Sequence, residues 1–238
     1  LKKPGMYIGN INPIMEDMYI WNQQQQKIIS KNILYSPGLY KIYDEILVNA
    51  IDETTRVNKQ YPLTLLDINI QSDNITIIND GPGIEVKIHP KYKIYIPELI
   101  FGNLLTSSNY DEDEKRITGG THGLGAKLTA IYSKKFIIHI NDPINQLSYY
   151  QVFENNLAKI NKPVIKKLNK GTTIGKVSIQ FYPDFKKFGQ EEEYFSYDLI
   201  ALLKKRVYDT AWYLSNSNYI ENSNNINVIL NDEIINEK

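Results

Sequence analysis

Four glycines within the seven positions 119–125 give this chain the residue types that bind phosphate. The stretch reads Thr118-Gly119-Gly120-Thr121-His122-Gly123-Leu124-Gly125-Ala126-Lys127, and the apolar segment 128–132 follows it directly. Glycine lets backbone N–H groups approach an anion, and a following helix adds unpaired N–H groups and the positive end of its dipole. The pattern predicts a phosphate cradle, although a glycine run alone is also compatible with a mobile linker.

The spacing around this glycine segment excludes two common phosphate loops. A Walker loop has GxxxxGK followed by Ser or Thr, whereas here the lysine follows GxGA and Leu128 comes next. A Rossmann loop follows a strand, whereas residues 110–116 are rich in acidic side chains. Residues 106–122 are instead expected to form one long loop of the kind used for lids and binding segments.

Three further polar residues share one face of a predicted helix. Glu45, Asn49 and Asp52 are spaced at i, i+4 and i+7, so they project within about 60 degrees of one another. They lie beside an apolar stripe at helical spacing, formed by Leu39, Ile42, Tyr43, Ile46, Leu47, Ala50 and Ile51. The three can face one ligand site, or they can be ordinary polar residues of a solvated face.

Two other segments carry polar groups suited to a nucleotide. Asn79-Asp80-Gly81-Pro82-Gly83 follows a predicted strand, so a carboxylate at the strand end could accept from an amino group, or the segment could be only a turn. Ser107, Ser108 and Asn109 supply hydroxyl and amide groups that could contact a ribose or cap a loop.

Composition limits the classes of protein that this chain can represent. Its 238 residues are enough for a sizeable core, and 27 basic residues balance 27 acidic ones. A net charge of zero argues against the chain being the main electrostatic footprint on nucleic acid. The absence of cysteine excludes disulfides and cysteine zinc sites, and no apolar run reaches the length of about 18 residues that predicts a membrane span.

The remaining periodicity predicts a mixture of strands and helices. A short strand is expected near Met6–Ile8, a hairpin loop at Gln23–Gln26, and a hairpin formed by 64–70 and 75–79. Short and long helices are expected at 97–105, 128–132 and 194–214. Further strands are expected at 136–140, 147–153, 174–182 and 227–230.

Taken together, these motifs resemble the three ATP-binding boxes of the GHKL, or Bergerat-fold, ATPases. That family includes gyrase and topoisomerase II, Hsp90, MutL and histidine kinases. Within it, the stretches 37–50, 96–111 and 118–128 are similar to the ATPase domain of eukaryotic-type DNA topoisomerase II, a type IIA enzyme. The resemblance implies an α+β two-layer sandwich, with a mixed, mostly antiparallel sheet of about eight strands covered by helices.

The resemblance also implies roles for individual residues. Glu45 would be the general base that deprotonates the attacking water, and Asn49 would hold Mg²⁺ beside the phosphates of ATP. Asp80 would accept from the adenine amino group, with Asn79 and Gly83 beside the nucleotide. The ribose side would be lined by Ser107, Ser108 and Asn109, and the phosphates would be wrapped by Gly120, Thr121, His122, Gly123, Leu124, Gly125, Ala126 and Lys127.

Some positions depart from the family pattern. His122 and Leu124 stand where cellular members usually have Asn and Tyr, which changes side-chain contacts but keeps the backbone N–H groups. For the threonine near the adenine, Thr172 and Thr173 follow a glycine as in the family, whereas counting back from Phe181 places Val177 there. Neither alternative is assigned to the site.

At the level of the whole protein, the resemblance implies one GHKL ATPase (N-gate) domain over residues 1–238, cut before the transducer domain and lacking the N-terminal arm. Its partners would be duplex DNA and a second copy, which dimerises on ATP binding in the full-length enzyme, with no membrane partner. It would act in the nucleus if cellular, or in a viral factory or host cytoplasm if viral. The alternative is another GHKL class, either an Hsp90- or MutL-like clamp or a histidine kinase catalytic domain.

Overall fold

The protein is built on one large twisted sheet, described here from a computed structural model that covers residues 5–55, 63–103, 125–216 and 226–236. The sheet has nine strands in the order β11-β10-β3-β4-β9-β5-β6-β7, with β8 also paired to β6. The strands are β3 (Leu65–Ile70), β4 (Ile75–Asn79), β5 (Ser133–Asp142), β6 (Leu147–Glu154), β7 (Lys159–Ile160), β8 (Val164–Lys167), β9 (Lys176–Pro183), β10 (Asn227–Leu230) and β11 (Glu233–Ile234). Only the β10–β3 pairing is parallel among the described strands, so the sheet is mixed and mostly antiparallel.

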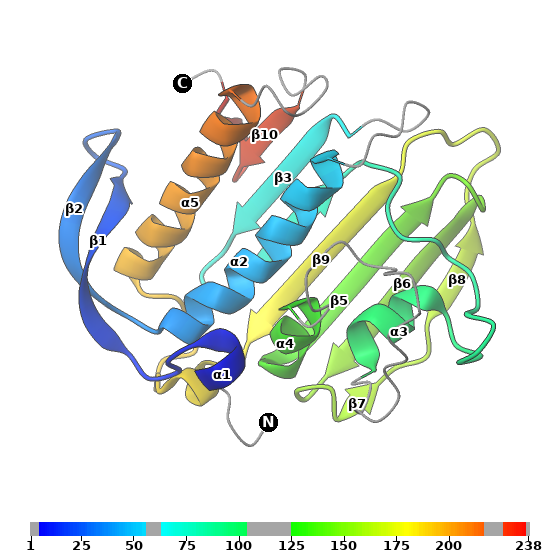
Figure 1. The fold of residues 1–238 in the computed structure, drawn as a ribbon, viewed down its shortest axis with the longest axis horizontal. Helices are drawn as coiled ribbons and strands as arrows, with labels where there is room; N and C mark the ends of the chain where they lie inside the picture. The colour runs from blue at the N-terminus through cyan, green and yellow to red at the C-terminus, as the bar shows by residue number, and fades with distance from the viewer. Residues whose placement is uncertain (1–4, 56–62, 104–124, 217–225, 237–238) are drawn as a thin grey trace.

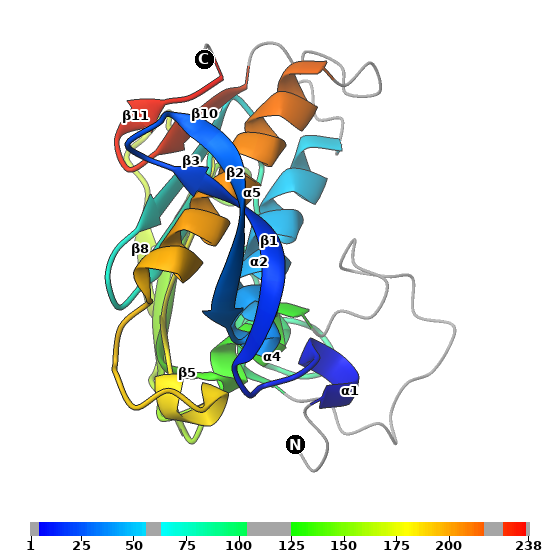
Figure 2. The same cartoon turned by 90° about the vertical axis from the view of Figure 1, so that its left-hand side faces the viewer.

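The described helices all lie on one face of this sheet (Figure 1, Figure 2). The helices are α1 (Gly5–Ile8), α2 (Pro37–Asp52), α3 (Ile96–Gly102), α4 (Gly125–Ile131) and α5 (Tyr197–Asn216). Every second side chain is buried along β4 and β9, and along β5 from Phe136 onward, which is the alternation expected for a sheet with one face in the core. The core therefore lies between the sheet and the helices.

The central helix α2 starts where its sequence specifies a start. Ser36 caps it by accepting a hydrogen bond from the Leu39 N–H at 3.3 Å, and Pro37 occupies the first turn, where no N–H partner is needed. Seven of its residues are buried: Gly38, Leu39, Ile42, Tyr43, Ile46, Leu47 and Ala50. Burying each large apolar side chain stabilises the fold by about 1.5–3 kcal/mol, so the apolar stripe fixes the rotation of α2.

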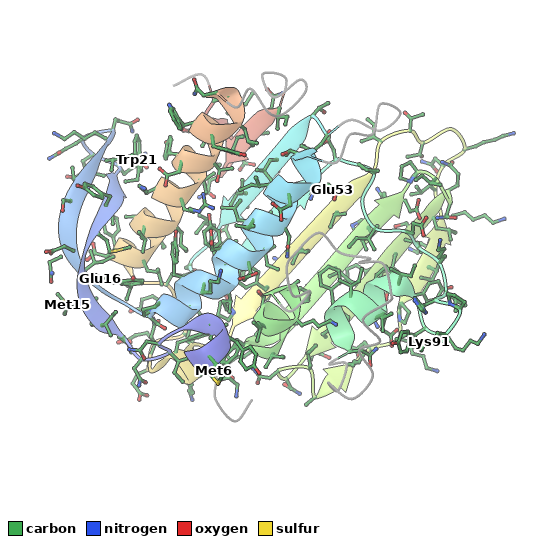
Figure 3. The ribbon with its side chains drawn as sticks, viewed as in Figure 1. Met6, Met15, Glu16, Trp21, Glu53 and Lys91 are labelled. Atoms are coloured by element: carbon green, nitrogen blue, oxygen red, sulfur yellow. The ribbon has the colours of Figure 1, made fainter. Side chains whose placement is uncertain are left out.

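A separate antiparallel hairpin, β1 (Ile14–Asn22) and β2 (Lys27–Tyr35), packs on α5 instead of joining the large sheet. The Trp21 ring stacks on the Tyr208 ring with centroids 4.0 Å apart, and Trp21 lies between the hairpin and α5 in Figure 3. Lys31 and Asp198 form an ion pair at 2.6 Å between the same two elements. The hairpin thus extends the helical layer at the side of the molecule away from β8.

The predicted fold class, an α+β sandwich with a mixed, mostly antiparallel sheet under helices, is confirmed. The long helix from residue 38, the 64–79 hairpin, and the strands at 136–140, 147–153, 174–182 and 227–230 all form as predicted, within a few residues. The strand expected near Met6–Ile8 is wrong, because this segment is the helical turn α1, whose Ile8 packs against the start of α2 at Gly38. Three apolar residues are too few to distinguish helical from strand spacing.

Candidate functional site

The exposed edge of α2 carries an acidic residue held by a cation. A carboxylate oxygen of Glu45 lies 2.6 Å from Lys41 Nζ, one helical turn earlier, and the Glu45 side chain is about a quarter exposed. The neighbouring acid, Asp44, instead faces α5, where its Oδ1 accepts from Arg206 Nε at 2.8 Å. The two acids therefore have different surroundings, and only Glu45 borders the glycine segment that follows.

The start of α4 lies directly against Glu45. A Cβ built on Gly125 would come 2.6 Å from the Glu45 carboxyl carbon, so a larger residue here would displace the Glu45 carboxylate from its observed position. The position of α4 is fixed by the fully buried Thr129, whose hydroxyl donates to the Ile42 carbonyl of α2 at 2.8 Å. The last glycine of the predicted phosphate cradle and the predicted base are thus in contact.

The glycine turn after β4, which contains Gly81, lies against the C-terminal end of α2. A Cβ on Gly81 would lie 3.3 Å from Glu53 Cγ, in the short 3-10 turn Glu53–Thr55 that continues α2, and Glu53 lies at this end of the helix in Figure 3. Asn49 is four residues from both Glu45 and Glu53, so it lies on the same side of the helix between the two glycine segments. Its side chain is exposed. One face of α2 therefore lies beside both the Gly81 turn and the glycine segment that ends at Gly125.

Asn79 and Asp80, adjacent at the end of β4, have opposite environments. Asn79 is only 5 % exposed, and its carboxamide oxygen is buried with no hydrogen-bond partner among the described residues. Asp80 accepts from the Thr64 N–H at 2.8 Å, the Leu65 N–H at 2.8 Å and the Thr64 hydroxyl at 2.6 Å. Asp80 thus ties β4 to the start of β3, while Asn79 keeps a buried acceptor that a ligand can satisfy.

The turn after Asp80 packs tightly on the start of β9. Gly83 has a φ of +73°, a conformation that favours glycine, and a Cβ there would lie 3.0 Å from Val177 Cγ2. Val177 is also the register partner of Asn79. Thr172 lies elsewhere, in a local turn where its hydroxyl donates to the Asn169 carbonyl at 2.8 Å. Of the two positions considered for the threonine near the adenine, Val177 is the one beside Asn79 and Gly83.

Lys127 is a buried cation at the end of the glycine segment. Its side chain is 7 % exposed, and the described part of the chain offers it no ion-pair partner. Burial lowers the pKa of Lys127 below its ordinary value of 10.5. A charge buried in this way gains stability from an anionic ligand, which agrees with its predicted place beside phosphates.

Part of the predicted site lies outside the described residues. Ser107, Ser108, Asn109, Gly120, Thr121, His122, Gly123 and Leu124 belong to this part. Across the ranges that are described, no group of three or more His, Asp or Glu side chains could hold a metal ion. The amide oxygen of Asn49 nevertheless suits Mg²⁺, which binds oxygen ligands and usually uses one or two protein groups plus phosphate oxygens and water.

Two residues of this site, Lys41 and Thr129, were not identified from the sequence, and Asn79 was identified without its burial. The i, i+4 spacing of Lys41 and Glu45 on a helix is a signal that predicts their pairing. The alternation of Ile75, Ile77 and Asn79 along a strand likewise predicts that Asn79 faces the core, and Asp80 does not. By contrast, the contact of Thr129 with α2 joins elements 87 residues apart, and nothing local in the sequence predicts it.

Comparisons with known proteins agree with this geometry. The family described as histidine kinase-, DNA gyrase B- and HSP90-like ATPases matches residues 35–180. DNA topoisomerase 2 of Plasmodium falciparum is 44 % identical over 217 residues, covering 89 % of this chain and 15 % of that protein. DNA topoisomerase 2 of Arabidopsis thaliana is 43 % identical over 221 residues, covering 93 % and 14 %. The chain thus spans about one seventh of the length of these curated relatives.

Solved structures give the same result. The ATPase region of Saccharomyces cerevisiae topoisomerase II superposes with a TM-score of 0.83 at 39 % identity, covering 98 % of this chain and 58 % of that one. The ATPase and transducer domains of topoisomerase II from Balamuthia mandrillaris give a TM-score of 0.83 at 33 % identity, covering 98 % and 57 %. Among the described residues, no helix is both long enough and apolar enough to cross a membrane.

Proposed function

The chain belongs to the histidine kinase-, DNA gyrase B- and HSP90-like ATPase family, and from this we propose that it is the ATP-binding and hydrolysing N-gate domain of a type IIA DNA topoisomerase. The relatives that support this proposal are named DNA topoisomerase 2, and the similar solved structures are ATPase regions of topoisomerase II. The alternatives, an Hsp90- or MutL-like clamp and a histidine kinase catalytic domain, are not favoured by these relatives.

The observation that carries the proposal is the contact between Gly125 and Glu45. It brings the end of a glycine-rich segment and the start of a helix against a carboxylate that is partly open to solvent. Hydrolysis of ATP needs a positioned water and backbone N–H donors aimed at the phosphates. In this proposal the water oxygen attacks the γ-phosphorus while Glu45 accepts a proton from that water. The bond between the γ-phosphorus and the ADP oxygen breaks as the new bond forms.

The base of the nucleotide is proposed to bind at the end of β4. The resemblance assigns Asp80 as the acceptor for the adenine amino group. We propose Asn79 in its place, because the Asn79 oxygen has no partner among the described residues and the Asp80 carboxylate already accepts three hydrogen bonds. Gly83 and Val177 would flank the ring, since Gly83 packs against Val177 and Val177 is the register partner of Asn79. The role of Asp80 is then to hold the turn in place.

The phosphates are proposed to bind between the glycine segment and α2. Lys127 and the backbone of Gly125 and Ala126 would contact them, together with the rest of the segment Gly120–Leu124, while Ser107, Ser108 and Asn109 would contact the ribose. Asn49 would hold Mg²⁺, which would supply positive charge to offset the negative charge of the phosphates. In the full-length enzyme, ATP would favour closure of two such domains around duplex DNA, because it binds the closed dimer more tightly.

The test separates binding from hydrolysis with the substitution Glu45→Gln. Loss of the Glu45 carboxylate as general base is expected to lower the rate of single-turnover hydrolysis of Mg·ATP by about 10²–10⁴-fold. The affinity for a non-hydrolysable ATP analogue should change little. Asp73→Asn, in the distant turn between β3 and β4, serves as the control and should keep full hydrolysis. Hydrolysis unaffected by Glu45→Gln would refute the assignment of the base.

A further inference from the structure

Positive charge is concentrated in one stretch of this otherwise neutral chain. Residues 155–183 contain no acidic residue and six lysines, namely Lys159, Lys162, Lys166, Lys167, Lys170 and Lys176. Outside this stretch, 21 of the 27 basic residues remain against all 27 acidic ones. A balanced total therefore conceals a strongly basic segment, and the charge of the whole chain is the wrong quantity for judging contact with a polyanion.

The fold places this segment at the edge of the sheet. β8 pairs with β6 through Tyr150–Leu147 and lies at the right-hand edge of the sheet in Figure 1. Lys162, Lys166, Lys167 and Lys170, which we term the lysine edge, are all exposed. Within the described ranges none of these four forms a salt bridge, whereas Lys159 pairs with Glu154 at 2.6 Å. The lysine edge thus presents four ammonium groups to solvent.

Protection of an edge strand explains only part of this arrangement. Lysines on an edge strand prevent pairing with the strand of another molecule. This purpose is served by Lys166 and Lys167, which lie within β8. Lys162 and Lys170 lie outside the strand, where they block no backbone pairing. The extended cluster indicates a partner with closely spaced negative charges.

We propose that the lysine edge contacts the phosphate backbone of duplex DNA. This rests on the proposed function, in which the enzyme acts on DNA, and adds a contact surface to the domain. Duplex DNA carries one negative charge per about 1.7 Å of axis, so several exposed lysines can neutralise phosphates at once. Contacts with the phosphate backbone carry no sequence information. This agrees with an enzyme that acts on duplexes of any sequence.

The surface is well separated from the nucleotide site. Four strand spacings, from β4 through β9, β5 and β6 to β8, separate Asn79 from Lys166 and Lys167. At about 4.8 Å per spacing this is roughly 19 Å. DNA on the edge and ATP beside α2 can therefore bind together, and substitutions on the edge should leave nucleotide binding intact.

The test replaces Lys162, Lys166, Lys167 and Lys170 with glutamine and follows binding of a fluorescent 20-base-pair duplex between about 50 and 200 mM salt. Loss of four phosphate contacts is expected to reduce the slope of log affinity against log salt by up to about 3.6. The control replaces four exposed lysines elsewhere, Lys27, Lys93, Lys186 and Lys187, and should retain the wild-type slope. Both variants are also titrated with a non-hydrolysable ATP analogue. Retained binding of the analogue shows that the fold and the proposed nucleotide site are intact, so a change in DNA binding is then due to the replaced lysines.

Several results would overturn the proposal while nucleotide binding stays intact. These are absence of DNA binding by the wild type, an unchanged slope in the edge variant, or equal losses in the edge and control variants. Equal affinity of the wild type for a poly-glutamate chain of matched charge would also overturn it, in favour of an acidic protein partner.

Discussion

Replacing Asn79 and Asp80 one at a time should produce opposite effects on stability and on nucleotide binding. Asp80→Ala removes the acceptor of three hydrogen bonds and leaves the Thr64 and Leu65 N–H groups without it. Hydrogen bonds to charged groups contribute about 1.5–3 kcal/mol each, and those of one carboxylate are not additive. Because Asp80 is only partly buried, we expect the free energy of unfolding to fall by about 2–4 kcal/mol in total.

Asn79→Ala removes a buried oxygen that has no hydrogen-bond partner among the described residues. Leaving such a group unsatisfied costs about 1–3 kcal/mol, so its removal offsets the packing that is lost. We expect the free energy of unfolding to stay within about 1 kcal/mol of wild type, while affinity for an ATP analogue falls about tenfold because the adenine amino group loses its acceptor.

Urea unfolding without nucleotide and calorimetric titration with the analogue measure the two quantities independently. Asp80→Ala should reduce stability strongly and should change affinity little once the protein is folded. If instead Asn79→Ala reduced stability as much as Asp80→Ala and left affinity unchanged, the assignment of Asn79 as the acceptor would be wrong.

Three further substitutions test the phosphate end of the site. Gly125→Ala places a methyl group where the Glu45 carboxylate lies, so single-turnover hydrolysis should fall at least about 10²-fold, and wild-type hydrolysis would contradict the contact. Lys41→Gln removes the ion pair with Glu45 and should lower hydrolysis about two- to fivefold at unchanged analogue affinity, with Lys41→Arg restoring the rate. Because burial lowers the pKa of Lys127 in the folded protein, the unfolded chain binds more protons between that pKa and 10.5, and the free energy of unfolding should rise with pH across this interval. Lys127→Met should abolish this rise in urea unfolding curves and weaken binding of the analogue, and an unchanged pH dependence would refute the role of burial.

The parts of the fold that the sequence predicts are those with a clear period. The apolar stripe of α2 repeats over four turns, and its polar neighbours Glu45 and Asn49 lie on one face as their spacing requires. In the hairpin from residue 64 to 79, buried and partly buried side chains alternate along both strands. Shorter elements carry no such period, which explains why α1 was expected as a strand and why β7, β8 and β11 were not expected.

The candidate site was predicted less completely because its geometry depends on tertiary contacts. Residue types indicated a carboxylate at the end of β4. The proposal of Asn79 in its place depends on the hydrogen bonds that Asp80 accepts from Thr64 and Leu65 and on the burial of the Asn79 oxygen, which only the assembled sheet shows. The close approach of Gly125 to Glu45 joins segments 80 residues apart, and only the packing of α4 on α2 produces it. Such contacts follow from the assembled core and not from any local pattern.

The central claim is that this chain binds ATP with Mg²⁺ on the face of α2 that carries Glu45 and Asn49. Calorimetric titration of the wild type and of Asn49→Ala with a non-hydrolysable ATP analogue, with and without Mg²⁺, tests it most directly. We expect binding that requires Mg²⁺ in the wild type and is lost or greatly weakened in Asn49→Ala, with Asp73→Asn behaving as the wild type. Absence of binding by the wild type, or equal binding by Asn49→Ala, would contradict it.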